Sequence, residues 1–361
     1  MRRPARSPEG LARQHDELIR AATELPEPAL TQFLAAGIAG LVREGNRTPD
    51  RARRLFLDAE AAGVHVMPVQ PYSPIPDTRQ LPPSLWTRPF DLRDTIDLRV
   101  AEQRAWLETV GPWMAELADV PADGRDADGT FYWLNRWFPP VDARVSYALM
   151  RQHQPKLVIE VGGGYSTMIA ARAAARNGRT EVITIEPQPR PALRKGLAGM
   201  RLIEAPLESV DPALFDRLGD GDMLFIDSSH SGRIGSDVTH AFFNVFPRLA
   251  PGVFVHIHDI FLPWDYPSSW ALDRRTFFTE QYLLQAFLMF NGAYEIQWLS
   301  SLLMRDHIDD VARHLGPLPR PEDYAASASH DAALMRRREA LGDPQPSSAW
   351  IRRQAARITH D

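Results

Sequence analysis

The sequence predicts an α/β protein built on a doubly wound, mostly parallel sheet with helices on both faces. Two observations support this prediction. From Val141 onward, short apolar runs alternate with stretches of helical periodicity, and such runs are typical of strands that are buried on both faces. The first run, "KLVIEV", is followed at once by three glycines and a helical stretch, which is the pattern of a strand, a tight turn and a helix.

The elements follow in a regular order. Helical patterning with Gly and Pro breaks covers 9–62, and a proline-dense segment at 64–89 is expected to be extended and stiff. Strands are expected in "KLVIEV", "TEVITIEP", "MRLIEAP", "DMLFID" and "GVFVHIHD". The segment 274–288 has the pattern of an amphipathic helix, for which a solvated polar face that includes Arg274, Glu280 and Gln281 is the default expectation.

These elements predict three regions. A helical N-terminal region covers 1–140 and includes the Pro-rich connector 64–89. A Rossmann-like domain covers 141–310. A C-terminal extension over 311–361 is rich in Pro, Ala and charge, and it is expected to be loosely attached and partly flexible.

Composition narrows the classes of function. The chain has 361 residues, 44% of them hydrophobic, and a formal net charge of −5, so there is no general case for binding nucleic acid or an anionic membrane. It contains no cysteine, which excludes thiolate metal sites and cysteine nucleophiles. The basic N-terminus has no apolar run behind it, so we expect a cytoplasmic protein that does not insert into a membrane.

In a doubly wound sheet, ligands bind beyond the carboxyl ends of the strands. The first strand ends in "VIEVGGGYST", where glycines allow a ligand to approach the backbone N–H groups. Glu160 precedes these glycines; its carboxylate would repel a pyrophosphate but could accept hydrogen bonds from an ammonium group. Glu186 ends the second strand, a position that suits an acceptor for the two hydroxyls of a ribose.

"EVGGGYS" followed by "IEP" resembles class I S-adenosylmethionine-dependent methyltransferases, in particular a bacterial O-methyltransferase-like subgroup that acts on small molecules. The resemblance extends over most of 60–300, from "VHVMPVQPYSPIPDT" to "DMLFIDSSHSGRIGSDV" and "GVFVHIHDIFLPWDYP". It implies S-adenosylmethionine as cofactor, with its methionine part at Glu160 and the glycines and its ribose at Glu186. The residues expected to bind the cofactor are Glu160, Gly162, Gly163, Gly164, Ser166, Glu186 and Asp227.

Polar side chains also follow the fourth and fifth strands. Asp227 and His230 come after the fourth, and His258 and Asp259 end the fifth, so they should lie close together because neighbouring strands are about 4.8 Å apart. His256 lies inside the fifth strand and is expected to be a core histidine. His230, His258 and Asp259 are the predicted catalytic residues, because a neutral imidazole beside the acceptor can take a hydroxyl proton.

A metal is the alternative for the same cluster. Metal-dependent O-methyltransferases are similar here, and the resemblance implies Asp227, His258 and Asp259 as ligands of a divalent ion such as Mg, Mn or Fe. His258 stands where a carboxylate is usual in that group, and a histidine ligand suits Mn or Fe better than Mg.

The acceptor is expected to be a small molecule with a hydroxyl group. Tyr72 and Asp77 in the Pro-rich connector, and Trp264 and Tyr266 in "FLPWDYPSSW", are candidate substrate contacts. Simple packing or a structural strap is the alternative for each.

Two other functions stay open from the residues. A nicotinamide-dependent oxidoreductase could use the glycine turn, although Glu160 and the lack of a third glycine at Thr167 argue against it. A non-catalytic, methyltransferase-like scaffold is the second. The helical N-terminus is as compatible with a homodimer interface as with covering the site.

Overall fold

The computed structural model describes residues 26–45, 49–124, 129–319, 323 and 346–355. The chain forms two compact units, residues 1–81 and 82–361. In the first unit, helices α2 (Glu27–Gly45) and α3 (Pro49–Ala61) pack against each other, so the expected N-terminal helices are present. Within the described ranges, no helix has the length and apolar character needed to cross a membrane.

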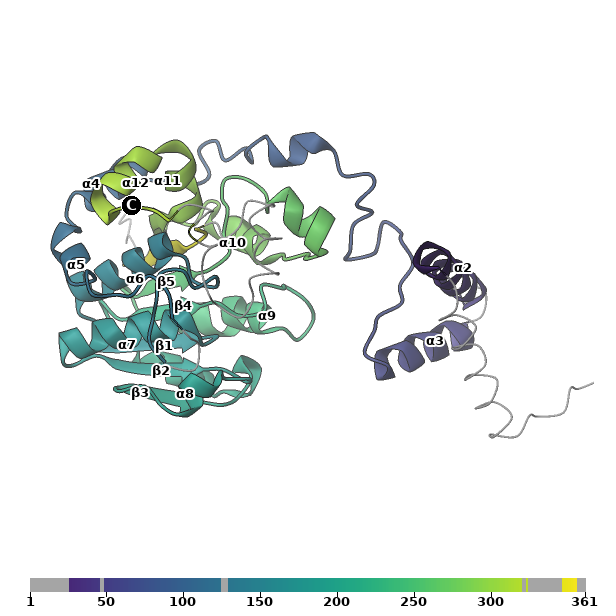
Figure 1. Ribbon diagram of the computed structural model, residues 1–361, viewed down its shortest axis with the longest axis horizontal. Coiled ribbons are helices and arrows are strands. Elements are labelled where there is room, and N and C mark those ends of the chain that lie inside the picture. Colours follow the sequence, from purple (N-terminus) through teal and green to yellow (C-terminus); the bar gives the residue numbers. More distant parts are fainter. Residues whose placement is uncertain (1–25, 46–48, 125–128, 320–322, 324–345, 356–361) are drawn as a thin grey trace, which may run out of the picture. The chain divides into compact units, whose positions relative to one another are not determined.

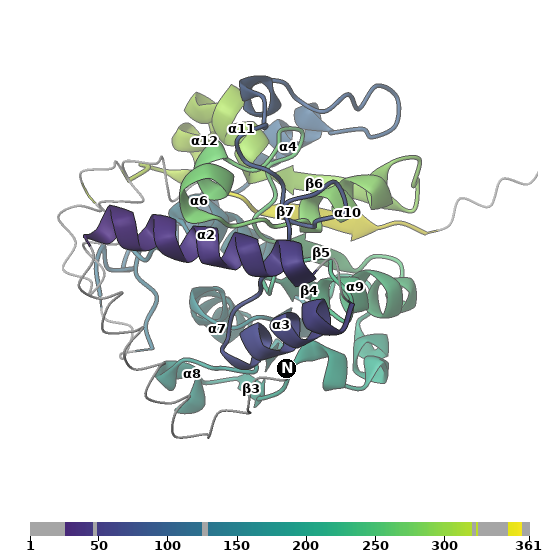
Figure 2. The same ribbon diagram turned by 90° about the vertical axis from the view of Figure 1, so that its right-hand side faces the viewer.

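The second unit is built around a seven-stranded sheet with the strand order β3-β2-β1-β4-β5-β7-β6. Figure 1 labels β1 to β5, and Figure 2 labels β6 and β7. Strands β1 to β5 are all parallel to one another. Strand β7 is antiparallel to both of its neighbours, β5 and β6. This arrangement confirms the mostly parallel, doubly wound sheet. The strands are β1 (Leu157–Val161), β2 (Glu181–Ile185), β3 (Met200–Ile203), β4 (Met223–Ile226), β5 (Phe254–Ile257), β6 (Tyr294–Leu299) and β7 (Ala349–Arg353).

The register of the sheet places four strand ends side by side. Val161 at the end of β1 pairs with Ile185 of β2 and with Ile226 of β4, and Ile226 pairs with Ile257 of β5. The residues that follow these four positions therefore leave the sheet at the same level. The strand order reverses between β1 and β4, which is where ligands bind in sheets of this kind.

Helices surround the sheet, and α6 packs against α7 (Figure 1), while α12 packs against α4, α5 and α6. Helix α6 begins after two prolines and is buried along nearly its whole length. The helices of this unit are α4 (Val100–Leu107), α5 (Gly111–Ala115), α6 (Pro140–His153), α7 (Tyr165–Asn177), α8 (Pro191–Arg194), α9 (Asp237–His240), α10 (Glu280–Leu288), α11 (Ser300–Asp306) and α12 (Ile308–Leu315).

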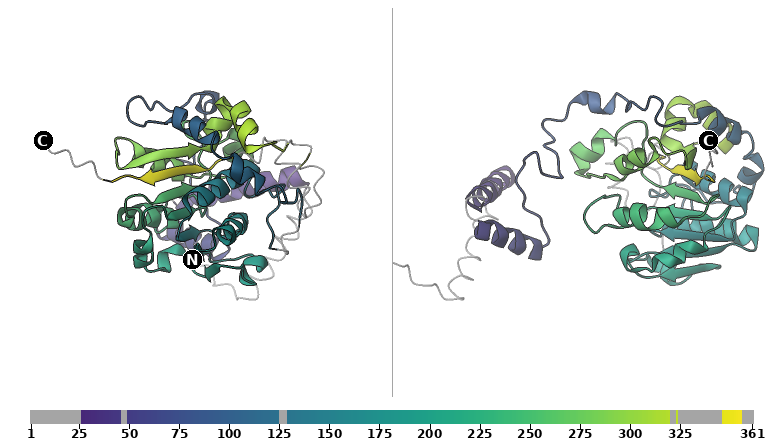
Figure 3. Two further views of the ribbon diagram at one scale, coloured as in Figure 1. Left: turned by 90° about the vertical axis from the view of Figure 1, so that its left-hand side faces the viewer. Right: turned by 180° about the vertical axis from the view of Figure 1, so that it is seen from behind.

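The expected region boundaries were wrong in two places. Residues 349–353, assigned to a loosely attached extension, form β7 inside the sheet between β5 and β6 (Figures 2 and 3). The first boundary falls after residue 81 and not after 140, because α4 and α5 pack against α12 of the second unit. Of the remaining residues of the extension, 320–322, 324–345 and 356–361 lie outside the described residues.

Candidate active site

A cavity of about 430 Å³ opens at the carboxyl ends of β1, β2, β4 and β5. It brings together most of the residues predicted from the sequence. Its walls include Gly162, Gly163, Gly164, Ser166, Glu186, Asp227, His230, His258 and Asp259, together with Arg136, Trp137, Phe138, Arg190, Trp270, Arg274 and Phe278.

The glycine turn is shaped by its contact with the end of β4. Gly162 has φ +86°, a conformation that favours glycine, and a Cβ there would lie 1.7 Å from the carbonyl oxygen of Asp227. The N–H of Gly163 donates a hydrogen bond to Oε2 of Glu186 at 3.0 Å. The N–H of Gly164 donates to Oγ1 of Thr167 at 2.9 Å. The turn and Glu186 therefore form one hydrogen-bonded unit on one side of the cavity.

Glu160 lies beneath this turn and is not among the residues that line the cavity. Its carboxylate is 1% exposed and accepts hydrogen bonds from Oγ1 of Thr167 at 2.5 Å and from Oγ1 of Thr184 at 2.8 Å. Because Oγ1 of Thr167 also accepts a hydrogen bond from the N–H of Gly164, Glu160 stabilises the turn through Thr167. Its predicted direct contact with the cofactor stays a prediction.

Burial raises the pKa of Glu160 from 4.5 to about 7. The folded protein therefore binds this proton more tightly than the unfolded chain, and stability falls as pH rises through about 4.5 to 7. Glu160→Gln removes this dependence. Between pH 5 and pH 8 we expect the wild type to lose roughly 2–3 kcal/mol of unfolding free energy relative to the variant. Denaturant unfolding of both proteins at the two pH values measures the difference, and parallel pH profiles would contradict the expectation.

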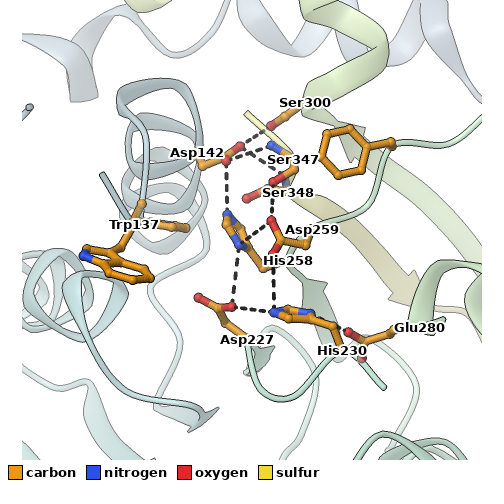
Figure 4. A network of polar contacts seen from close by, with 12 residues as sticks. Trp137, Asp142, Asp227, His230, His258, Asp259, Glu280, Ser300, Ser347 and Ser348 are labelled. Atoms are coloured by element: carbon orange, nitrogen blue, oxygen red, sulfur yellow. Dashed lines mark hydrogen bonds and ion pairs between the residues drawn. The ribbon is translucent and has the colours of Figure 1, made fainter. Parts of the chain in front are cut away.

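Two histidines and two aspartates form a closed ring on the other side of the cavity (Figure 4). Nε2 of His230 lies 3.2 Å from Oδ1 of Asp227 and 3.5 Å from Oδ2 of Asp259. Nδ1 of His258 lies 3.6 Å from Oδ1 of Asp227 and 3.4 Å from Oδ1 of Asp259. These four residues are called the His–Asp ring below.

Each histidine of the ring is held from behind by a fully buried carboxylate. Nδ1 of His230 bonds Oε2 of Glu280 at 2.9 Å, and Nε2 of His258 contacts Oδ2 of Asp142 at 3.3 Å. Glu280 begins α10 and Asp142 lies in the first turn of α6. The default expectation of a solvated face at Glu280 and Gln281 was wrong, because both are fully buried.

The pKa shifts in the ring follow from the number of carboxylates, because four of them surround two imidazoles. Burial works against charge on both imidazoles, but the carboxylates around them prevail and raise the pKa of His230 and of His258 well above the ordinary value. Burial likewise opposes charge on Asp227, yet the two histidines hold the pKa of its carboxyl below the ordinary value. Both histidine side chains are nearly buried, whereas those of Asp227 and Asp259, 27% and 19% exposed, face the cavity.

The backbone turns sharply at two members of the ring. His230 has φ +55° and Asp259 has φ +58°, which is uncommon for residues other than glycine. Along a regular strand, Asp259 would point to the face opposite His258, but this turn brings both side chains to the ring. Backbone strain of this kind concentrates at functional sites. His256 stays inside the sheet as expected, stacked on Phe225.

The predicted metal site has the right donors but not the geometry of a bound ion. Within the part of the chain that the structure describes, no three His, Cys, Asp or Glu side chains are arranged to hold a metal ion. His258 instead pairs through Nδ1 with Asp227 and with Asp259.

The predicted substrate residues belong to two different units of the chain. Trp264 and Tyr266 line a separate cavity of about 590 Å³, and the Tyr266 side chain packs against Phe261 and Trp270. They do not line the cavity that holds the His–Asp ring, and their role as substrate contacts stays a prediction. Tyr72 and Asp77 belong to the first unit, where Tyr72 is exposed and Asp77 pairs with Arg79, and their substrate role stays a prediction.

Several residues of the site have no signal in the sequence. Asp142 meets His258 across a sequence separation of 116 residues. Ser347 lies two residues before the unexpected strand β7 and donates a hydrogen bond from Oγ to Oδ1 of Asp259 at 3.0 Å. In the aromatic stretch 131–140, Trp137 and Phe138 line the cavity.

Comparison with known proteins agrees with this geometry. Residues 159–260 match the methyltransferase-domain family Methyltransf_24. An uncharacterised protein from Archaeoglobus fulgidus is 30% identical over 158 residues, which cover 41% of this chain and 71% of that protein.

Solved structures with a similar course of the chain include two O-methyltransferases. TomG from Streptomyces achromogenes, in complex with SAM, is 15% identical and covers 69% of this chain and 89% of its own, with a TM-score of 0.33. The O-methyltransferase from Bacillus cereus, in complex with SAH, is 18% identical and covers 53% and 82%, with a TM-score of 0.31. The methyltransferase MycE, in complex with Mg, SAH and mycinamycin VI, is 14% identical and covers 62% and 51%, with a TM-score of 0.29.

The matched family spans β1 to the end of β5, which contains the glycine turn, Glu186 and the His–Asp ring. The nicotinamide-dependent and scaffold alternatives have no support in these matches. The strand order, the position of the cavity and the family match all indicate the same class of enzyme: the chain belongs to the class I S-adenosylmethionine-dependent methyltransferases.

Proposed function

We propose that the enzyme methylates a hydroxyl group of a small acceptor, either a small metabolite or a sugar-like compound. The observation that supports this proposal is the shared cavity, which has the glycine turn and Glu186 on one side and the His–Asp ring on the other. The acceptor oxygen attacks the methyl carbon of the sulfonium, the carbon–sulfur bond breaks, and S-adenosylhomocysteine leaves. The hydroxyl proton passes to a group of the protein or to water.

The two sides of the cavity have different tasks in this reaction. The glycine turn, fixed by Glu186 and supported by Glu160, orients the cofactor. The His–Asp ring holds the acceptor oxygen in line with the methyl group, and such alignment supplies much of the rate enhancement in transfers between two bound substrates. Trp137, Trp270 and Phe278 form an aromatic wall that excludes water and packs against the acceptor.

The charges of the ring favour a divalent cation as a partner. Four carboxylates, those of Asp142, Asp227, Asp259 and Glu280, surround two imidazoles. One divalent cation could take the place of the protons that the two imidazoles gain, because imidazole ligands bind metals in their neutral form. A bound ion would lower the pKa of the acceptor hydroxyl and position it.

We therefore include in the proposal a cation held by Asp227, His258 and Asp259, with His230 beside it. The nitrogen donors favour Mn or Fe over Mg. The outer carboxylates support the same conclusion, because histidines that bind metals usually donate their second N–H to such a group. Without an ion, His230 or His258 in its neutral form would take the hydroxyl proton.

Calorimetric titration with S-adenosylhomocysteine tests the proposal, first on metal-stripped protein and then with Mg or Mn added. We expect binding on the order of micromolar. We further expect heat from Mn that disappears in Asp259→Ala. A cofactor signal without any metal signal would leave His230 and His258 as the bases. The absence of binding under every condition would contradict the methyltransferase activity itself.

A further inference from the structure

Among the residues that the structure describes, the first unit exposes more large apolar side chains than the much larger second unit. Its helices α2 and α3 have 19 and 13 residues and pack against each other (Figure 1). On α2, Leu34, Ile38 and Leu41 are 49%, 46% and 58% exposed. Their spacing places them on one side of the helix. Exposed apolar stripes of this kind are typical of interfaces with other molecules.

Helix α3 exposes a second stripe, and the order of its residues is symmetric. Four exposed residues follow the spacing i, i+3, i+4, i+7 and so lie on one face of the helix: Arg53, Phe56, Leu57 and Glu60. The charged residues stand at the two ends of this face, and the apolar residues lie between them. The ring of Phe56 stacks on His65 but is still 38% exposed. The centre of the face lies between Phe56 and Leu57.

We propose that the protein forms a homodimer in which the α3 helices of two copies pack antiparallel through this face. A two-fold axis between Phe56 and Leu57 places Arg53 of each copy opposite Glu60 of the partner subunit. The apolar residues of the two copies then pack against one another. The dimer also brings four helices together, and bundles of four helices commonly bury stripes such as the one on α2.

The charges of α3 favour a second copy over other partners. A purely acidic or purely basic partner would place a like charge opposite one end of the face, which is unfavourable. An anionic membrane would meet Glu60 as well as Arg53, whereas helices that lie on membranes have basic polar faces. A second copy supplies the matching charges in reverse order, because an antiparallel helix presents the same residues from its other end.

Sedimentation velocity of the full chain over a range of concentrations tests the proposal. We expect a concentration-dependent species with twice the mass of the 40.7 kDa chain. Phe56→Asp should abolish this species, because it places a carboxylate in the apolar centre of the interface in both copies. Calorimetry with S-adenosylhomocysteine shows whether the second unit of each variant is folded. Cofactor binding should be unchanged, because α3 belongs to the first unit.

Charge reversal tests the antiparallel pairing of the two α3 helices. Arg53→Glu places two carboxylates opposite each other at both ends of the interface, and Glu60→Arg does the same with guanidinium groups. Each single variant should raise the dissociation constant of the dimer roughly tenfold, and the double variant should restore it. Asp58→Arg is the matched control. It makes the same change of charge as Glu60→Arg but about 160° away around the helix, so the dissociation constant should change little.

Three results would overturn the proposal. A monomer at every concentration would mean that no second copy covers the face. A dimer that persists in Phe56→Asp would place the interface elsewhere in the protein. Single reversals without effect, or a double variant that does not recover, would contradict the antiparallel pairing of α3.

Discussion

Gly162→Ala is expected to abolish measurable binding of S-adenosylhomocysteine and to lower the melting temperature. The alanine Cβ would lie 1.7 Å from the carbonyl oxygen of Asp227, and the backbone φ of +86° is unfavourable for any residue with a Cβ. The left-handed conformation alone costs about 1–2 kcal/mol. Relief of the clash must also separate the ends of β1 and β4, which both contribute residues to the wall of the cavity. We expect an affinity loss of roughly 100-fold or more, which corresponds to about 3 kcal/mol.

Gly164→Ala is the matched control in the same turn. Its backbone φ is −175°, and the nearest atom to an added Cβ would be Nε of Arg190 at 3.9 Å, which is ordinary contact. This variant should fold with nearly wild-type stability and lose much less affinity than Gly162→Ala. The measurement is calorimetry with S-adenosylhomocysteine plus a thermal melt of each protein. Equal losses for the two glycines would show that the contact between β1 and β4 does not set the site.

The strand ends could be predicted because they depend only on periodicity and on the geometry of parallel sheets. Once "DMLFID" and "GVFVHIHD" were identified as strands, their ends had to meet at one edge of a doubly wound sheet. The register confirms this, with Ile226 opposite Ile257. The grouping of Asp227, His230, His258 and Asp259 follows from that register.

The remainder depends on contacts that no local pattern encodes. Asp142 lies on α6, whose sequence is that of an ordinary buried helix. Only the packing of α6 in the folded protein brings Asp142 to His258. Strand β7 is five residues long and far from its partners in sequence, so the tail looked unattached. Trp264 is close to Asp259 in sequence, but this did not predict where its side chain lies. The loop after β5 places Trp264 at another cavity.

Glu280→Leu is expected to cost about 3–5 kcal/mol of unfolding free energy. Glu280 is fully buried, and its Oε2 bonds Nδ1 of His230 at 2.9 Å. The carboxylates around His230 raise the pKa of its buried imidazole, and Glu280→Leu removes one of them. Removing one partner of a buried ion pair is strongly destabilising. Glu280→Gln keeps the volume and a hydrogen-bond acceptor, so its loss should be smaller. Denaturant unfolding at pH 7 gives both values.

An exposed ion pair of the same protein is the control for the loss of unfolding free energy in Glu280→Leu. Asp216 pairs with Arg248 on the surface, where the two side chains are 48% and 40% exposed, and such pairs contribute at most about 1 kcal/mol. Asp216→Asn should therefore change stability little. If Glu280→Leu costs no more than Asp216→Asn, the contact between Glu280 and His230 is not a buried charge pair. If Glu280→Leu loses much unfolding free energy but still binds S-adenosylhomocysteine, Glu280 stabilises the His–Asp ring and is not needed for the glycine turn. This agrees with its contact to His230.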